Sequence, residues 1–438
     1  MAVWATRESP DNPSKWSNLI NGTIRDRRSR AICREMPRYV QMTVQTFIWD
    51  TSAALRPPSA TLAQNPFDAV PLTQMTHNRS SPSMNSPNAA ITEFEARVGA
   101  KWLNIAEACD LSCKTRSELA KNLAGMDSED TSIVVSGSLA RNEFTPGSDI
   151  DWSLLVDGFA DANHQAVREK VALIINRHAV KSPGQEGTLG QLAFSHELVH
   201  QIGGEDDTNR NTTRRLLLLL ESAVVGRPDA YERVVKNVLQ RYILEDDGFV
   251  NASGEYHVPR FLQNDFARYW RTMAVDFAYK RRSRSGSGAA IRNLKLRMSR
   301  KLLYASGLLT CFGCHLGLIQ RPTIFPCKSV ASIHECVACL RESMRRTPLE
   351  ILASVFLRFP HLDDAGRTVF DAYDEFLGML ASEATRDALE KLPPRPSPDD
   401  PVWNRARRVS HSFRDGLLTL FFDSKSNLCD LTKMYGVF

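Results

Sequence analysis

The stretch that decides the fold covers residues 132–156 and reads S-I-V-V-S-G-S-L-A-R-N-E-F-T-P-G-S-D-I-D-W-S-L-L-V. A short apolar run at each end predicts a strand. The middle contains Gly137-Ser138 and, after ten further residues, Asp149 and Asp151. Because side chains alternate along a strand, the two aspartates should point the same way while the isoleucine between them enters the core. The pattern predicts strand, glycine turn, loop and a second strand that begins at the acidic pair.

Two carboxylates beside a Gly-Ser turn suit a divalent cation that carries a triphosphate. Mg²⁺ prefers oxygen ligands and is usually held by one or two carboxylates together with phosphate oxygens. Backbone N–H groups of a turn can receive phosphates, and glycine lets the backbone approach closely. We therefore predict Asp149 and Asp151 as metal ligands, and Gly137 and Ser138 as contacts of the β- and γ-phosphates.

The loop between the turn and the acidic pair contributes two more candidates. Arg141 could clamp a phosphate oxygen through two guanidinium N–H groups, or it could form a surface pair with Glu143. Ser148 directly precedes the acidic pair, and we predict that it is an orienting hydrogen-bond donor of the nucleotide site rather than a catalytic group.

The arrangement G-S-x10-D-x-D, at Gly137, Ser138, Asp149 and Asp151, resembles the signature of the DNA polymerase β-like nucleotidyltransferase superfamily. The resemblance implies an α/β core with a small mixed sheet, an NTP substrate, and Mg²⁺ or Mn²⁺ as cofactor. It also implies a third carboxylate near the strand that follows the next helix.

Two glutamates are candidates for that third carboxylate. We predict a helix over residues 162–178 and a third strand over 189–194, and Glu186 precedes this strand while Glu197 follows it. We place Glu186 in the catalytic set, and the choice between the two stays open.

A second, less specific similarity follows the core. An Asp pair before a Thr-rich turn, a leucine-rich helix ending in L-L-E-S, and the tetrapeptide G-R-P-D occupy residues 206–229. This order is similar to the segment after the catalytic strands of PII-protein uridylyltransferases and related nucleotidyltransferases, so that the resemblance covers about residues 130–240. It favours a protein side chain as acceptor and leaves RNA ends and small molecules open. Nothing downstream resembles the phosphohydrolase or regulatory domains of those enzymes.

Composition divides the chain into three parts. Residues 24–35 are basic, and residues 56–88 are rich in Pro, Ser, Asn and Thr with weak apolar periodicity, so we expect residues 1–90 to be a disordered or low-complexity leader. Residues 91–250 should form the catalytic domain. Residues 255–438 carry amphipathic stretches with a period of 3.6 residues, which predict a helical domain packed beside it.

A basic segment opens the predicted helical domain. Residues 260–301 contain twelve Lys and Arg residues against Asp265 and Asp276, a local net charge of +10. The segment could place cations over the triphosphate or bind the phosphates of an RNA acceptor. A plain solvated helix face is the third reading.

Two further motifs resemble metal-binding sequences. Two C-x-x-C pairs, Cys311/Cys314 and Cys336/Cys339, approach the spacing of a zinc site. Their apolar helical surroundings favour buried free cysteines, with zinc as the alternative. The sequence H-E-L-V-H at residues 196–200 matches a metalloprotease motif, but that motif belongs on a helix with a third ligand downstream, and we interpret the match as chance.

The whole chain has 438 residues, nine cysteines and a net charge of +5. An odd cysteine count in a chain of this length favours reduced thiols, and we expect a cytoplasmic location with no membrane partner. The sequence does not fix the NTP, the acceptor or the oligomeric state. The rival to an enzyme is a regulatory module that senses a nucleotide through an incomplete set of carboxylates.

Overall fold

The computed structural model describes residues 88–178, 189–249, 256–283, 288–318 and 330–436 of the chain. All of these lie in one compact unit, which spans residues 81–438. The predicted leader, up to residue 87, and the candidate Glu186 lie outside the described residues.

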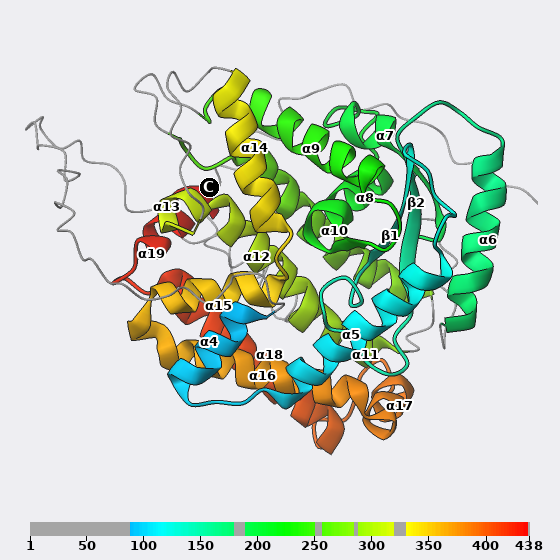
Figure 1. The fold of residues 1–438 in the computed structure, drawn as a ribbon. Coiled ribbons are helices and arrows are strands. Elements are labelled where there is room, and N and C mark those ends of the chain that lie inside the picture. Colours follow the sequence, from blue (N-terminus) through cyan, green and yellow to red (C-terminus); the bar gives the residue numbers. More distant parts are fainter. Residues whose placement is uncertain (1–87, 179–188, 250–255, 284–287, 319–329, 437–438) are drawn as a thin grey trace, which may run out of the picture. The chain divides into compact units, whose positions relative to one another are not determined.

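A four-stranded mixed sheet contains the deciding stretch (Figure 1). Its strands are β1 (Thr131–Ser136), β2 (Asp151–Val156), β3 (Gln191–Phe194) and β4 (Ser222–Val224), in the order β3-β2-β1-β4. Strand β1 runs antiparallel to both β2 and β4, whereas β3 runs parallel to β2. The small mixed sheet confirms the predicted α/β fold of the core.

Six helices lie among the described residues of 89–244, two before the first strand and four after the second. Their bounds are α4 (Ala89–Val98), α5 (Leu103–Asn122), α6 (Asn163–His178), α7 (Ser195–Val199), α8 (Asn209–Leu220) and α9 (Asp229–Leu244).

Helices cover both faces of the sheet because both faces are apolar. One cluster packs Ile133 and Trp152 from the strands against Leu119 of α5 and Val171 of α6. On the opposite face, leucines of α8 join the large core cluster that includes Val134. The sheet is therefore closed over most of its length, and its accessible end is the one where β2 begins.

The remainder of the chain is helical, as predicted. The bounds are α10 (Arg260–Ser283), α11 (Ala289–Lys295), the π-helix η1 (Leu296–Arg300), α12 (Lys301–Cys311), α13 (Gly313–Leu316), α14 (Val330–Met344), α15 (Pro348–Arg358), the 3₁₀ helix η2 (Pro360–Leu362), α16 (Asp363–Ala381), α17 (Glu383–Lys391), α18 (Pro401–Phe422), α19 (Asn427–Leu431) and the π-helix η3 (Thr432–Gly436). Within the described residues, no helix combines the length and apolar character needed to cross a membrane.

Helices from the two ends of the described chain pack together. Helix α4 packs against α15, and α5 packs against α16. Phe94 of α4 stacks on Phe356 of α15, with ring centroids 5.6 Å apart. The predicted catalytic and helical parts therefore share one core, and the boundary between residues 250 and 255 stays a prediction.

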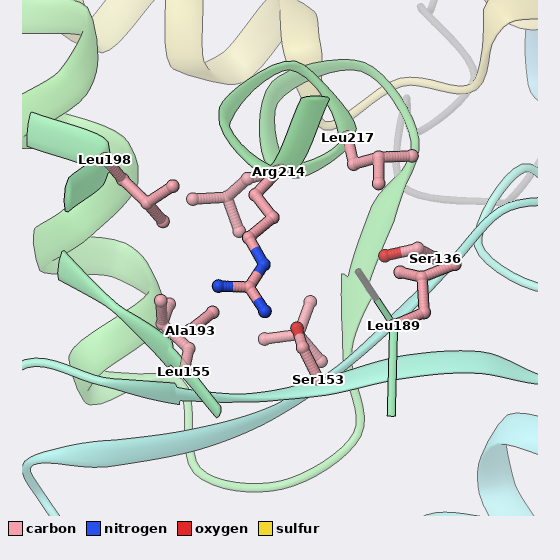
Figure 2. Close-up of a pocket in the computed structure, with 10 residues that line it drawn as sticks. Ser136, Ser153, Leu155, Leu189, Ala193, Leu198, Arg214 and Leu217 are labelled. Carbon is pink, nitrogen blue, oxygen red and sulfur yellow. The ribbon is translucent and has the colours of Figure 1, made fainter. Parts of the chain in front are cut away.

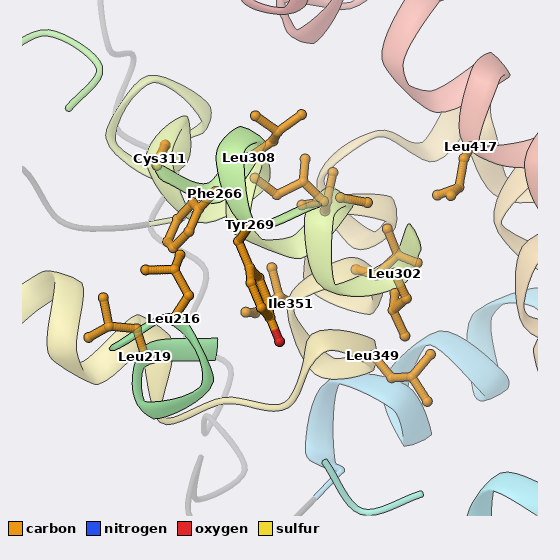
Figure 3. Close-up of a cluster of buried hydrophobic side chains, with 14 of the residues drawn as sticks. Leu216, Leu219, Phe266, Tyr269, Leu302, Leu308, Cys311, Leu349, Ile351 and Leu417 are labelled. Carbon is orange, nitrogen blue, oxygen red and sulfur yellow. The ribbon is translucent and has the colours of Figure 1, made fainter. Parts of the chain in front are cut away.

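Helix α10 has a central place in this core. Figure 3 shows its Phe266 and Tyr269 between leucines of α8 and residues of α12 such as Leu308. Because α8 ends beside the sheet, α10 connects the sheet to the helical part of the molecule.

Candidate active site

The turn after β1 brings three chain segments together. Ser136, the last residue of β1, pairs with Asp151 on one side and with Ser222 on the other. Gly137 follows with a φ of 70°, in the left-handed region that favours glycine. A Cβ atom on Gly137 would lie 3.1 Å from Oδ2 of Asp151. The turn therefore requires a glycine because the Asp151 carboxylate lies against it.

Gly137 and Ser138, the two predicted phosphate contacts, differ in whether their donor groups already have a partner in the protein. The N–H of Gly137 donates to the carbonyl oxygen of Glu221 at 3.2 Å and so has a partner within the protein. Ser138 is partly exposed, and within the described part of the chain neither its amide nor its hydroxyl donates a hydrogen bond. Ser138 is the better placed of the two to meet a ligand.

A tight turn delivers Asp149 to the start of β2. The N–H of Ser148 donates to the carbonyl oxygen of Thr145 at 3.0 Å, with Pro146 and Gly147 as the two central residues. Gly147 has a φ of 80°, as a type II turn requires at this position. The hydroxyls of Ser148 and Thr145 lie 3.0 Å apart. Ser148 thus stabilises the turn, and its place in a nucleotide site stays a prediction.

The two aspartates form a repulsive pair. Asp149 and Asp151 are both partly buried, and the pKa of Asp151 is raised to about 7 by burial and by the charge of Asp149. The charges of Arg300 and Lys295 offset only part of this effect. Two close carboxylates that repel one another, with no Cβ on the facing glycine, are a suitable donor set for a divalent cation. Asp149 and Asp151 would hold it.

Glu221, which the sequence analysis did not single out, anchors the other side of the turn. It caps the C-terminus of α8, and its buried carboxylate pairs with Arg141 and, at 2.7 Å, with Arg300. The hydroxyl of Tyr269 donates to it at 3.1 Å. Burial alone would raise the pKa of Glu221, but Arg300 and Arg141 lower it below its ordinary value. Glu221 is an anion that holds two cations.

Arg141 is the buried cation of this group, with 5% of its side chain exposed. Its guanidinium also pairs with Glu143 at 2.7 Å, and both side chains are 5% exposed or less. The pair that the sequence offered as a surface alternative therefore forms in the interior. Because two carboxylates already occupy the guanidinium, this arrangement favours a positioning role for Arg141, and its phosphate contact stays a prediction.

A π-helix places cations opposite the aspartates. Lys295 ends α11, and η1 then continues to Arg300. In a π-helix residues five apart lie nearly in line, and the charges of Lys295 and Arg300 both act on Asp151. Arg297 instead donates to Ser410 of α18. Single π-turns often mark functional sites.

The third carboxylate is the part that the sequence did not resolve. Strand β3 has the sequence Q-L-A-F and contains no acid. Gln191 pairs with Ser153, so it lies on the same face as Asp151 but two residues further along. Glu197 lies in α7, after the end of β3 that is opposite the aspartates, and is 3.6 Å from Arg214. This position favours an ion pair over a metal ligand for Glu197, and the third carboxylate, Glu186 or Glu197, stays a prediction.

A buried arginine fills the sheet face beyond the aspartates. Arg214 reaches from α8 into a cavity of about 20 Å³ between Ser153 and Ala193 (Figure 2). Burial and the nearby Arg210 lower its pKa to about 10, against the opposing charge of Glu197. Within the described residues, this side chain fills the sheet face between Ser153 and Ala193.

The other two motifs bring no group of metal ligands together among the described residues. His196 and His200 lie on and just after the short α7, with ring centroids 5.2 Å apart. No cysteine of the two C-x-x-C pairs forms a disulfide within the described part of the chain, and Cys311 and Cys336 are buried. Across the described residues, no three His, Cys, Asp or Glu side chains gather closely enough to hold a metal ion. A cation between Asp149 and Asp151 would need a substrate or another residue to complete its ligands.

Comparison with known proteins agrees with this geometry over part of the chain. Residues 114–186 match the family model described as "Nucleotidyltransferase domain". This segment contains β1, the glycine turn and the aspartate pair. Neither a curated protein nor a solved structure matched the chain. The match supports the superfamily that the G-S-x10-D-x-D pattern indicated, and it does not extend to the relation with PII-protein uridylyltransferases.

Proposed function

We propose that the protein is a metal-dependent nucleotidyltransferase that transfers a nucleoside monophosphate from an NTP to an acceptor hydroxyl and releases pyrophosphate. The observation that carries this proposal is the pair Asp149 and Asp151 at the open end of the sheet, opposed by the cations Lys295 and Arg300. The nucleotidyltransferase match over residues 114–186 supports the general activity.

The aspartates would hold Mg²⁺ or Mn²⁺ together with the substrate phosphates. The ion, when bound, supplies Lewis-acid stabilisation of the phosphate charge. Lys295 and Arg300 contribute positive charge on the opposite side, and Glu221 fixes the guanidinium of Arg300 at 2.7 Å before substrate arrives. Such preorganised charge is worth more in a partly buried site than in water.

The reaction itself is an in-line displacement. The acceptor oxygen forms a bond to the α-phosphorus while the bond from that phosphorus to the bridging oxygen breaks, and pyrophosphate carries away the electron pair. The hydroxyl proton passes to a general base, for which Glu186 is our candidate. Ser138, with free amide and hydroxyl groups, would contact the leaving phosphates. Arg141 supports the site by holding Glu221.

The proposed acceptor, a protein side chain, rests on the less specific resemblance, that of residues 206–229. The similarity of residues 206–229 to PII-protein uridylyltransferases favours a protein side chain. RNA ends and small molecules are the other acceptor classes that the same chemistry serves.

The experiment that tests this function is transfer of label from α-³²P-NTP. Each of the four NTPs is offered with cell lysate, with protein and with RNA separately, so that base preference and acceptor class are read together. Asp149→Ala combined with Asp151→Ala should reduce labelling to background. Asp110→Ala removes an exposed acid of α5 and should leave labelling unchanged. Undiminished labelling in the double variant would overturn the assignment.

A second function is favoured by one observation. Strand β3 has no acid and Glu221 is saturated by its cations, so the described residues supply two carboxylates at the site rather than three. A module with this set could bind an NTP and sense it without transfer. In that case the wild-type protein would bind NTP in the presence of Mg²⁺, the double variant would not, and neither would transfer label.

A further inference from the structure

A large cavity lies on the face of α10 that points away from the aspartates. Its volume is about 490 Å³, and its walls come from α10, the first residue of α8, Tyr304 of α12 and the end of η3. Cavities that take small molecules usually have volumes of about 300–1,000 Å³. Tyr269 contacts Glu221 from the other face of the same helix, so the cavity and the active site lie about one helix diameter apart, roughly 10 Å.

Two arginines line the cavity. Arg268 is held in place because it donates to the carboxylate and the carbonyl oxygen of Asp207, both at 2.7 Å. Arg271, one turn further, is exposed. Asp276 is the one acid among the described lining residues. Because Asp207 already pairs with Arg268, Arg271 is the cation that an anionic ligand would meet first.

A buried acceptor in the wall lacks a partner. Gln263 is 5% exposed and lines the cavity. Its amide nitrogen donates to the carbonyl oxygen of Tyr435, which assigns the other atom of the amide as oxygen. Within the described residues, that buried oxygen Oε1 accepts no hydrogen bond. This oxygen has almost no accessible surface, so Gln263 contributes to the wall of the cavity but does not offer this acceptor to a ligand.

An aromatic wall completes the cavity. Tyr304 lines it and stacks on Trp270, with ring centroids 5.9 Å apart and planes 15° apart. A tyrosine backed by a second ring is a rigid surface, and planar bases stack well on such surfaces. Ala267 and Val275 add apolar surface from α10.

We propose that this cavity binds a nucleotide, distinct from the NTP of the active site. The phosphate lies against Arg271, with Arg268 beside it, and the base packs on Tyr304. The nucleotide is either free or one unit of a strand. The basic end of the helix, Lys280–Arg282, would contact further phosphates of a strand.

Binding is tested with the full chain carrying Asp149→Ala and Asp151→Ala, in buffer without divalent cation, so that the active site does not contribute. The probes are AMP, inorganic phosphate and a fluorescently labelled ten-nucleotide RNA. Affinities come from calorimetry for the small probes and from fluorescence anisotropy for the RNA. Arg271→Ala, an exposed position, should weaken AMP or RNA binding about tenfold, as expected for the loss of one charge-assisted hydrogen bond. Arg367→Ala, an exposed arginine of α16, should change nothing.

The probes separate the possible sources of the nucleotide. Binding of AMP that depends on Arg271 supports a site for a free nucleotide, and binding of RNA alone supports a strand. Inorganic phosphate that binds as tightly as AMP would contradict recognition of the base and overturn the proposal. Equal affinity of Arg271→Ala and the parent for every probe, or no binding at all, would overturn it as well. None of these results depends on label transfer, so the proposed catalytic function can fail or stand separately.

Discussion

Two buried ionic clusters flank α8 and α10, and their compositions are nearly the same. In the first, Glu221 pairs with the buried Arg141 and with Arg300, whose side chain is 34% exposed. In the second, Asp207 pairs with the buried Arg215 and with Arg268, whose side chain is 36% exposed.

Each buried arginine has a second acid and each cluster includes a tyrosine. Arg141 also pairs with Glu143, and Arg215 also pairs with Asp265 at 2.9 Å. The hydroxyl of Tyr269 donates to Glu221, and the hydroxyl of Tyr242 donates to Asp265. The two clusters are therefore matched in their internal contacts.

The two clusters differ in the surroundings of their partly exposed arginines, Arg300 and Arg268. Arg300 acts on Asp151 of the candidate active site, whereas Arg268 lines the cavity on the opposite face of α10. The comparison teaches that a buried ion cluster does not by itself indicate catalysis, because both clusters stabilise the fold in the same way. We expect both to be needed for stability and only the Glu221 cluster to be needed for transfer.

Among these variants, Glu221→Gln should lower both the stability of the fold and the rate of label transfer the most. It leaves Arg141 buried with one acid and releases Arg300, so the free energy of unfolding should fall by about 3–5 kcal/mol. Turnover per folded molecule should fall about 100-fold because the positioned cation is lost. Denaturant unfolding and initial rates of label transfer measure the two effects.

Glu143→Gln is the matched control for that variant. It removes the other acid of Arg141 without touching Arg300, so stability should fall while turnover per folded molecule changes little. Full turnover in folded Glu221→Gln would show that the cluster serves the fold alone.

Asp207→Asn tests the second cluster. Arg215 has no exposed surface, and loss of its partner should lower the free energy of unfolding by about 3–5 kcal/mol. Label transfer per folded molecule should stay within about twofold of wild type because no member of this cluster faces Asp151. A drop in turnover as large as that of Glu221→Gln would erase the distinction between the clusters.

The sequence predicted the local geometry of the site better than its surroundings. Alternation along β2 and the glycine turn depend on neighbouring residues, and the structure has both as expected. Glu221 meets Arg141 across 80 positions of the chain, and no local pattern reveals such a pair. The five leucines before Glu221 indicated only a buried helix.

The helices, too, could be predicted only where their form depends on neighbouring residues. Periodicity placed α15 and α18 within a few residues of their ends, because apolar spacing follows directly from packing. It could not show that residues 296–300 form a π-turn, since that change of winding depends on the tertiary environment. That the charges of both Lys295 and Arg300 act on Asp151 became visible only in the structure. The amphipathic pattern continues over residues 364–390 without a break, but the structure divides this stretch at Ser382, which caps α17.

Acid titration should affect both clusters in the same direction. The pKa values of Asp207 and Glu221 lie below their ordinary values because arginines outweigh the effect of burial. The unfolded chain therefore binds more protons in this range, and stability is complete above the ordinary carboxyl pKa of about 4 and is lost as pH falls toward the lower folded values. Each group contributes a slope of up to about 1.4 kcal/mol per pH unit. Asp207→Asn should make the measured slope shallower, and an unchanged slope would contradict the lowered pKa.

The variants with the smallest expected effect remove one tyrosine hydroxyl from each cluster. Tyr269→Phe removes one buried hydrogen bond, to Glu221, and should lower the free energy of unfolding by about 1–2 kcal/mol. Tyr242→Phe removes the bond to Asp265 and also the bond that its oxygen accepts from Nε of Arg215 at 2.8 Å, so it should cost more. Both rings are almost fully buried, so the two changes are matched in packing. Only Tyr269 touches Glu221, and only its variant should lower turnover, by a few fold, because Glu221 then holds Arg300 less firmly. Parallel thermal unfolding and rate measurements compare them, and equal turnover in the two variants would mean that the position of Arg300 does not depend on this hydrogen bond.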